Sequence, residues 1–557
     1  MTGAERQRVT GVTLFYVALA VALAWPVSVN PGSRLLVDNP DAELYIWTLA
    51  WNAHAFVAQP LSIFDANIYH PYPNTLAYSE NLIGSALIAA PVIWLTGNLV
   101  LAVNVVQMLS LVLSGLGAYL LARRAGVGPL GAVLAGIVFL AAPPRFMRLG
   151  QLHLTTIQWV PFGLYFLHGY LDTGRARDLR LALWTFTLQA VTSGHGTIFL
   201  GVSMLALVLY RVALGERLAL RHRARDVGVA GALALGPLVL VFLPYRAAQR
   251  DVGLVRTLEN WLPTPESYLA SPSHLHQWLR ALVTDVDFNA AATAWLFPGV
   301  TVLVLALLSV LTLRAQGPGG WRERLRTDPG AFYVLLAVLA VLFIVPPPLG
   351  LWPHVYWMPG LNFIRVPSRF MILAMLALGV AAGAGFDRLA AGLRSGGRRV
   401  AFLALAALFV AEYFSAPVES VRYRIEIPAV DRWLATQPGP FVVAEVPVPS
   451  PRNAGAFERH HTMAMLHATA HWQKTVHGYS GIRPPLHERL YRELAMFPDE
   501  TSLASLREVG VTYVVVHEEL YRPHERADVE ARFARFADQL RLEHAAPTGR
   551  VYRVLAP

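Results

Sequence analysis

The stretch NLVLAVNVVQMLSLVLSGLGAYLL occupies residues 98–121 and contains no charged side chain. A helix of this length measures about 36 Å, which is enough to cross the roughly 30 Å of hydrocarbon in a bilayer. Similar apolar stretches recur up to residue 414, so the sequence predicts a mainly α, polytopic membrane fold. We expect about eleven transmembrane helices, within a range of 11–13, at residues 9–25, 98–121, 128–142, 154–171, 181–190, 199–212, 227–243, 300–313, 332–345, 370–386 and 400–414.

Composition supports this class and excludes several others. Of the 557 residues, 55% are hydrophobic and only 15% are charged, against about 25% charged in soluble domains. An ordinary soluble enzyme is therefore excluded. The chain has no cysteine, so disulfides, thiolate metal sites and cysteine nucleophiles are excluded as well. The net charge of +10 comes almost wholly from arginines divided among loops, so nucleic acid is not an expected partner.

The arginines also predict how the chain is oriented in the membrane. Short loops rich in arginine face the cytoplasm, and such groups occur at residues 6–8, 123–124, 175–180, 217–225, 314–326 and 388–399. This places the N-terminus in the cytoplasm and residues 28–97 in a large extracytoplasmic first loop. Residues 82–97, interrupted by Pro91, are then a juxtamembrane helix; a twelfth crossing is the alternative.

The composition changes after Pro417, where charged residues and histidines become frequent. We therefore expect a transmembrane module at residues 1–416 and an extracytoplasmic soluble α/β domain at residues 417–557. Periodicity predicts its elements. The strands are expected at 441–448 and 511–517, with a hairpin of 540–544 and 551–555, and the helices at 429–436, 456–470, 486–496, 502–509 and 525–539.

Three carboxylates, Asp38, Asp41 and Glu43, immediately precede the aromatic segment LYIWTLAW of residues 44–51. An amphipathic helix here would hold them at the membrane surface. One of the carboxylates would then act as a general base or a metal ligand. Alternatively, Asp38 or Asp41 only caps the N-terminus of this helix, and Glu43 favours its first turn.

One crossing followed by a large outer loop with an Asp motif resembles the polytopic GT-C glycosyltransferases, which include protein mannosyltransferases and aminoarabinose transferases. Further motifs resemble a bacterial branch of that group. They are Asp41 with Trp47 and Trp51, YHP at 69–71, AYSE at 77–80, Pro359-Gly360 and IRVPSRF at 364–370. The resemblance implies a catalytic Asp in the first loop, a polyprenyl-phosphate sugar donor and a soluble C-terminal domain.

Asp41 is our choice for the catalytic residue, and Asp38 is the competitor. These two residues are three apart, whereas the usual motif has adjacent carboxylates, so the base and any metal remain open. No cofactor is certain; a divalent cation such as Mg²⁺ or Mn²⁺ would have Asp38, Asp41 and Glu80 as candidate ligands.

Arginines are the candidates for holding the donor phosphate, because a guanidinium can bind phosphate bidentately. Arg365 and Arg369 are four apart at the start of a span, and helical spacing would put them on one face. Either of them can instead reach ordinary lipid headgroups. Arg256 is a further candidate, unless it only pairs with Glu259.

The remaining candidates would shape the sugar and acceptor site. They are His70, Tyr78 and Glu80 in the first loop, together with His153, His195, Tyr245, Glu259 and His471. His153 and His195 fall at outer span ends, where polar residues often line a cavity, although a structural histidine is the commoner case. His467 and His471 have a spacing that permits a metal pair, but the HExxH signature is absent.

Together with these residues, the resemblance implies an inverting glycosyltransferase of the bacterial inner membrane, which moves a sugar from a lipid-phosphate donor to a glycan, lipid or protein acceptor. Inversion follows from single direct attack, because a retaining enzyme would usually need a second carboxylate. A lipid or glycolipid transporter or flippase is the rival from another class. An inactive scaffold for envelope assembly is the third possibility.

Overall fold

The computed structural model describes residues 3–37, 39–215, 220–252, 263–284, 286, 294–312, 320–358 and 360–556. Contacts divide the chain into two units, each built from separate stretches of sequence. The first unit comprises residues 1–31, 104–240 and 256–420, and the second comprises residues 32–103, 241–255 and 421–557. The second unit thus joins the first loop to the C-terminal residues. The predicted domains, in contrast, are two continuous stretches of sequence that meet at residue 417, and this division stays a prediction.

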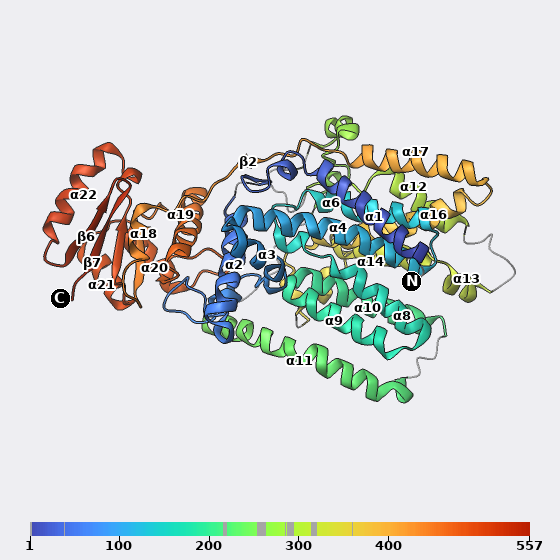
Figure 1. Ribbon diagram of the computed structural model, residues 1–557, viewed down its shortest axis with the longest axis horizontal. Coiled ribbons are helices and arrows are strands. Elements are labelled where there is room, and N and C mark those ends of the chain that lie inside the picture. The colour runs from blue at the N-terminus through green and yellow to red at the C-terminus, as the bar shows by residue number, and fades with distance from the viewer. Residues whose placement is uncertain are drawn as a thin grey trace. The chain divides into compact units, whose positions relative to one another are not determined.

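Over the described residues, the eleven apolar stretches predicted as spans lie mainly in helices, and the stretch 154–171 is interrupted at residues 156–158 (Figure 1). The helices outside the second unit, or shared with it, are α1 (Gly3–Leu23), α4 (Leu99–Ala125), α5 (Pro129–Ala141), α6 (Pro143–Phe146), α7 (Leu152–Thr155), α8 (Trp159–Thr173), α9 (Ala176–Thr192), α10 (Gly194–Ala213), α11 (Leu220–Val252), α12 (Val300–Leu311), α13 (Trp321–Thr327), α14 (Ala331–Ile344), α15 (Trp352–Val355), α16 (Met371–Leu389) and α17 (Ser395–Tyr413).

Within the described ranges, five helices are long and apolar enough to cross a membrane, or six if the bent pair α13 and α14 forms one span. The five are Leu99–Ala125, Pro129–Phe146, Gly194–Ala213, Val227–Val252 and Pro367–Leu389. The other predicted spans are helices of 12 to 17 residues, or begin with charged residues as α1 and α17 do. Helix α3 (Ile83–Thr96) has 14 residues, about 21 Å, and its juxtamembrane placement stays a prediction.

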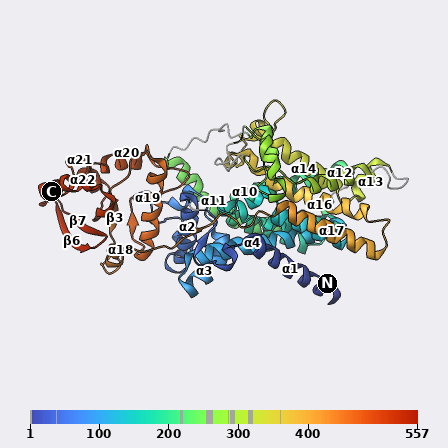
Figure 2. The same ribbon diagram turned by 90° about the horizontal axis from the view of Figure 1, so that it is seen from above.

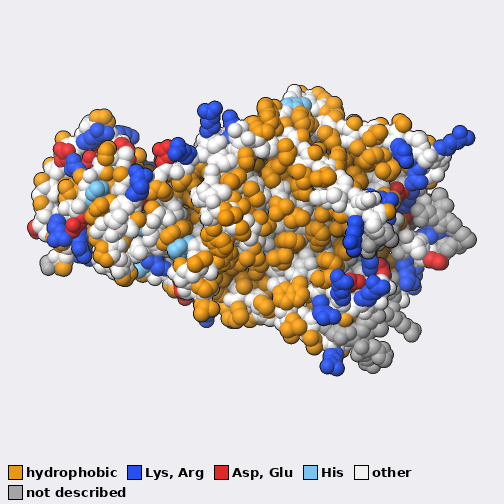
Figure 3. Space-filling view, viewed as in Figure 1, with side chains coloured by type: hydrophobic (Ala, Val, Ile, Leu, Met, Phe, Trp, Pro, Cys, Tyr) orange, Lys and Arg blue, Asp and Glu red, His pale blue; other side chains and the backbone are white. Residues whose placement is uncertain are grey.

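Hydrophobic side chains cover most of the helical part of the face shown in Figure 3. In the apolar window of α11 only 17% of the residues are buried, and Leu233, Val239 and Leu240 are among its exposed side chains. A helix that exposes leucine and valine along its length is suited to lipid and not to water. The chain is a multi-pass membrane protein.

Small residues allow α16 to pack closely in the first unit. A Cβ on Gly383 would lie 2.6 Å from the carbonyl oxygen of Gly131 in α5, and one on Gly385 would clash with the carbonyl oxygen of Leu305 in α12. Close backbone approach at glycines is how membrane helices gain contact area without a hydrophobic driving force. Helix α16 is accordingly buried along almost its whole length.

Replacing Gly383 by Val is expected to destabilise the first unit by about 1–3 kcal/mol, the usual cost of overpacking. The added side chain would meet the backbone of α5, which cannot rotate away as a side chain can. Thermal unfolding of the full chain in detergent measures the effect. Gly236→Val in α11 is the matched control, because a Cβ there meets nothing within 4 Å; equal melting temperatures for the two variants would contradict the prediction.

The second unit contains a five-stranded sheet in the order β4-β3-β5-β7-β6. Its strands are β3 (Val442–Val446), β4 (Lys474–Thr475), β5 (Tyr513–Val516), β6 (Leu540–Ala546) and β7 (Gly549–Val554). Strands β3, β4 and β5 are parallel, and β7 joins β5 and β6 antiparallel. The two predicted strands and the predicted hairpin are confirmed; the short edge strand β4 was not predicted.

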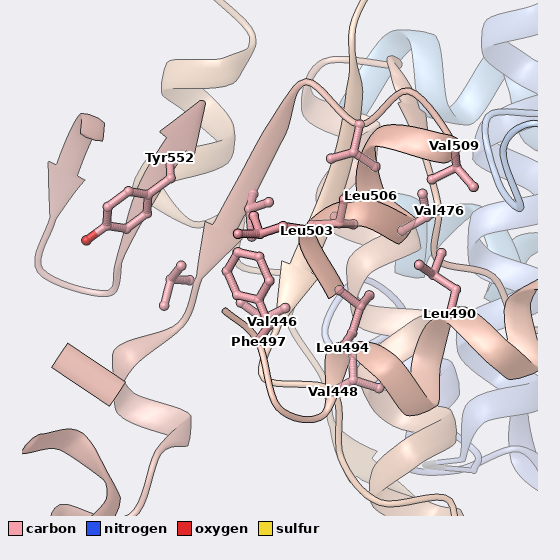
Figure 4. Packing of buried hydrophobic residues seen from close by; sticks show 14 of the residues in the cluster. Val446, Val448, Val476, Leu490, Leu494, Phe497, Leu503, Leu506, Val509 and Tyr552 are labelled. Atoms are coloured by element: carbon pink, nitrogen blue, oxygen red, sulfur yellow. The ribbon is translucent and has the colours of Figure 1, made fainter. Parts of the chain in front are cut away.

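Helices cover both faces of this sheet (Figure 2). They are α18 (Ala429–Leu434), α19 (Ala454–His467), α20 (Pro485–Leu494), α21 (Glu500–Glu508) and α22 (Pro523–Arg535), which confirms the five predicted helices. Strand residues alternate between the two faces. Val446 and its neighbours pack with Leu490, Leu494, Leu503 and Leu506 (Figure 4), whereas the opposite face packs against α18 through Val430 and Leu434.

The first loop belongs to the same unit as this sheet. Strand β1 (Arg34–Leu35) pairs antiparallel with β2 (Val421–Arg422), and α2 (Pro40–Ala58) packs against α19. Residues 66–70 are held by backbone hydrogen bonds, among them Tyr69 N to His477 O at 3.1 Å and His70 N to Thr475 O at 3.0 Å. The first loop and the C-terminal residues therefore form one folded body.

Candidate functional site

Asp41 lies in the first turn of α2, but it does not cap the helix. The N-cap is Asn39, whose side-chain oxygen accepts a hydrogen bond from the backbone N–H of Ala42 at 2.9 Å. The interpretation in which Asp38 or Asp41 serves as the cap is wrong, because asparagine satisfies the same backbone donor. The Asp41 carboxylate is thus not committed to the backbone.

The Asp41 carboxylate contacts a tyrosine from the C-terminal residues. The Tyr479 hydroxyl donates a hydrogen bond to Oδ1 of Asp41 at 2.9 Å. Burial is the main cause that raises the pKa of Tyr479, and the charges of Asp41 and Glu458 raise it further. Tyr479 therefore keeps its proton and remains the hydrogen-bond donor. It orients the Asp41 carboxylate, which can then take a proton from a substrate.

Glu43, two residues after Asp41, stabilises the fold around Asp41. Its carboxylate is 1% exposed and accepts hydrogen bonds from the hydroxyls of Thr462 and Tyr423, the latter at 2.8 Å. Arg459 lies 3.3 Å from the same carboxylate. These contacts satisfy a buried charge, and they tie α2 to α19 so that Asp41 is held in place beside Tyr479.

Several predicted sugar-site residues lie on the first loop of the same unit. Tyr78 ends the short helix Thr75–Tyr78, and its ring lies 5.7 Å from that of Tyr69. Its hydroxyl is buried and has no hydrogen-bond partner among the described residues. A buried hydroxyl without a hydrogen-bond partner is costly, so a hydroxyl of a bound ligand would stabilise it by forming that hydrogen bond.

Glu80, His70 and Tyr245 belong to the same unit. Glu80 is buried. The His70 carbonyl accepts a hydrogen bond from His487 at 3.0 Å. The Tyr245 hydroxyl donates to the Ser79 carbonyl at 3.1 Å and accepts from the backbone N–H of Asn81 at 3.0 Å. Tyr245 therefore shapes the loop that carries Glu80.

We tested whether the residues around Asp41 suit a divalent cation. Glu458 is close enough for the charge of Asp41 to raise its pKa, although burial is the larger cause. Of the described residues, none forms with Asp41 a group of three ligand atoms close enough to share an ion. The cation with Asp38, Asp41 and Glu80 as ligands stays a prediction, because Asp38 lies outside the described residues.

The first unit gathers cationic and imidazole side chains at the N-terminal ends of two spans. Nη1 of Arg369, in the short helix Pro367–Phe370 that precedes α16, lies 2.6 Å from Nε2 of His195 in the first turn of α10. The ring of His153 lies 4.9 Å from that of His195. The structure thus brings together three predicted site residues, and it sets the N-terminal ends of α10 and α16 side by side.

A second guanidinium joins this group. Arg148 is 3% exposed; burial lowers its pKa to about 9, and the charge of Arg369 contributes to that shift. Two guanidiniums that repel each other in a buried place are stabilised by an anion. The first unit therefore has the charge arrangement of an anion site.

The predicted helical pairing of Arg365 with Arg369 is wrong. Ile364 and Val366 are extended, and the helix begins only at Pro367. Proline disfavours a helical conformation for the residue before it, so Arg365 stands outside the helix. Arg365 is exposed, whereas Arg369 is half-buried on His195.

The spacing of His467 and His471, which would permit a metal pair, does not bring the two side chains together. Helix α19 ends at His467, and residues 468–470 form a tighter 3₁₀ turn. His471 therefore turns to Asp431, 3.7 Å away. His467 instead lies 3.4 Å from Glu445, which also lies 2.7 Å from Nε2 of His517.

The buried pair of Glu445 and His517 predicts a pH dependence of stability. Burial lowers the pKa of His517, but hydrogen bonds to Glu445 and Glu519 outweigh it and raise the pKa from 6.5 to about 10. The pKa of His517 is thus higher in the folded state than in the unfolded state. The contribution of this pair to the stability of the fold is therefore complete below pH 6.5 and is lost as the pH rises through about 10.

In buffer with a chelator, we expect the melting temperature of the full chain to fall more steeply over this window than that of a His517→Gln variant. Glutamine retains a donor to Glu445 but does not titrate, so parallel curves would contradict the prediction. Thermal unfolding at stepwise increasing pH provides the measurement.

Three predicted site residues, Asp38, Arg256 and Glu259, lie outside the described residues, as does Pro359. Tyr479, Arg148 and Glu445 were missing from the predicted site. Glu445 had a signal in the sequence, because it is a lone carboxylate in an otherwise apolar strand. Tyr479 and Arg148 had none, since only contacts with residues distant in sequence distinguish them.

Comparison with solved structures gives the class of fold. The mycobacterial arabinofuranosyltransferase AftD superposes with a TM-score of 0.59 at 16% identity, over 99% of this chain and 40% of that chain. The R1389S mutant of AftD gives 0.56 at 18% identity, over 98% and 41%. The oligosaccharyltransferase AglB from Archaeoglobus fulgidus gives 0.49 at 13% identity, over 93% and 70%. This chain has the fold of the GT-C glycosyltransferases.

The chain spans about 40% of the length of AftD, and likeness at this level of identity shows the fold alone. No protein-family model matches the sequence, and no curated protein matches it.

Proposed function

We propose that this chain is a membrane glycosyltransferase that moves a sugar from a polyprenyl-phosphate donor to an acceptor outside the cytoplasm. The observation that carries the proposal is the group of Arg369, Arg148 and His195 at the N-terminal ends of two apolar helices. An anion site at the end of a membrane span suits a phosphate that is attached to a lipid. The shared fold with an arabinofuranosyltransferase supports the same class of reaction.

In the proposed reaction the acceptor hydroxyl attacks the anomeric carbon of the sugar as the bond from that carbon to the phosphate oxygen breaks. Asp41, oriented by Tyr479, takes the acceptor proton. The polyprenyl phosphate leaves with the negative charge, which Arg369 and Arg148 stabilise as it develops. One direct displacement inverts the anomeric carbon.

Arg365 and the undescribed Arg256 remain proposed phosphate contacts, and Asp38 remains the proposed competitor of Asp41. Glu80, Tyr78 and His70 would bind the sugar, and the unsatisfied Tyr78 hydroxyl is the feature that supports this. The proposed location is the bacterial inner membrane, with the N-terminus in the cytoplasm and the C-terminal residues outside. The contact of Arg369 with His195 supports it, since the predicted orientation has α10 and α16 both enter from the outside.

The test is to reconstitute the full chain in vesicles with radiolabelled polyprenyl-phosphate pentoses and hexoses and with octyl glycosides as acceptors. We expect label to move from at least one donor to an acceptor, with inverted configuration. Movement of the labelled lipid across the bilayer without any transfer would overturn the proposal in favour of a transporter. If no donor gives either transfer or movement of the labelled lipid, the proposal would be overturned in favour of a scaffold.

A further inference from the structure

Three side chains that the proposed reaction does not use meet in the second unit. Oε2 of Glu445 lies 2.7 Å from Nε2 of His517 and 3.4 Å from Nδ1 of His467. The three ligand atoms lie within 4.8 Å of one another, and no member of the group is more than 9% exposed. Two imidazoles and one carboxylate are a common ligand set for zinc and similar ions.

The topology of the sheet explains why they meet. Glu445 is near the carboxyl end of β3, and His517 directly follows the neighbouring parallel strand β5. The chain goes from β3 to β4 on one side and from β5 to β6 beyond β7 on the other. Ligands of open α/β sheets bind beside the carboxyl ends of strands at such a reversal of direction.

A cavity of about 1170 Å³ opens at the same place, and Glu445, His467 and His517 all line it. It therefore offers a path for an ion and room for a fourth ligand. The other ring nitrogen of His517, Nδ1, lies 3.6 Å from Oε1 of Glu519. Carboxylates in this position commonly orient the histidine ligands of metals.

The neighbouring histidines His460, His461 and His477 are less suitable, although their nitrogens are also close together. Nε2 of His477 accepts a hydrogen bond from the backbone N–H of Glu445 at 2.6 Å, and its Nδ1 lies 3.0 Å from Nδ1 of His461. The rings of His461 and His477 are fully buried and stack on Tyr491. Both nitrogens of His477 and Nδ1 of His461 are thus engaged within the protein, and of the three histidines only His460 lines the cavity.

We propose that Glu445, His467 and His517 bind a divalent metal ion of the zinc class, with an open coordination position that faces the cavity. Ligand distances of about 2.0–2.2 Å require the three side chains to move apart only slightly around the ion. Water or an oxygen of a bound ligand completes the coordination. The site is independent of the proposed glycosyl transfer, because none of its residues takes part in that reaction.

The first experiment titrates Zn²⁺ into the metal-depleted full chain in detergent, in competition with a chromophoric chelator. We expect one equivalent to bind tightly, and Glu445→Gln or His467→Asn to weaken binding at least 100-fold. His524→Gln is the matched control, because the side chain of His524 is 74% exposed and lies outside the group. Unchanged affinity in the two ligand variants, or less than half an equivalent bound by the unaltered chain, would overturn the proposal.

A second variant guards against loss of folding. The chain has no cysteine, so His517→Cys introduces a single thiol that remains a metal ligand. With Co²⁺ we expect this variant, and not a His524→Cys control, to show a thiolate-to-cobalt charge-transfer band. Absence of the band in the folded variant, as judged by its tryptophan fluorescence, would overturn the site even if the protein binds zinc elsewhere.

Discussion

Replacing Asp41 by Asn is expected to lower the rate of glycosyl transfer by about 10²–10⁴-fold, the usual contribution of a general base. Asparagine fills the same space and can still accept the hydrogen bond of Tyr479. It cannot, however, take the acceptor proton. Binding of the donor should hardly change, so the loss should appear in kcat and not in the donor KM. The measurement is transfer in vesicles, with the donor that the unaltered chain uses.

Asp65→Asn is the matched control for this variant. Asp65 is another carboxylate of the first loop, and it accepts a hydrogen bond from the backbone N–H of Asn74 at 2.8 Å, which asparagine can also accept. Tyr479→Phe should have a smaller effect, because it removes the hydrogen bond that orients the carboxylate but leaves the carboxylate itself in place. Full activity of a folded Asp41→Asn variant would remove Asp41 as the base.

Arg369→Gln is expected to reduce transfer by about 10²–10³-fold, the range found when one group that stabilises developing charge is removed. It should also weaken binding of the polyprenyl phosphate product, because we propose that Arg369 and Arg148 together hold the phosphate. The transfer rate of an Arg369→Lys variant should lie between that of the unaltered chain and that of Arg369→Gln, since an ammonium is a point charge and cannot bind phosphate bidentately.

Arg394→Gln is the control for a lost positive charge, because Arg394 is exposed and precedes α17, away from the helix starts that carry the anion site. Binding of the lipid phosphate and transfer are measured on the same preparations. A variant at Arg369 that binds and transfers as well as the Arg394 control would show that the phosphate is held elsewhere.

Local chemistry made the elements of the fold readable in advance. Uncharged stretches were long enough to be recognised as membrane helices, and short apolar runs marked the buried strands β3 and β5 of the C-terminal sheet. Errors arose where two local rules competed. Asn39 took the capping place expected for an aspartate, and Pro367 delayed a helix so that Arg365 and Arg369 were separated.

The sequence alone determined the membrane class, the helices, the α/β character of the C-terminal residues, and Asp41 as a candidate base, because hydropathy and short motifs are properties of neighbouring residues. Only the tertiary structure decided that Tyr479 meets Asp41, that Arg148 joins Arg369, and that Glu445 meets His467 and His517. Such partners are up to 438 residues apart in the chain. Their meeting depends on how helices and strands pack, which no local pattern in the sequence records.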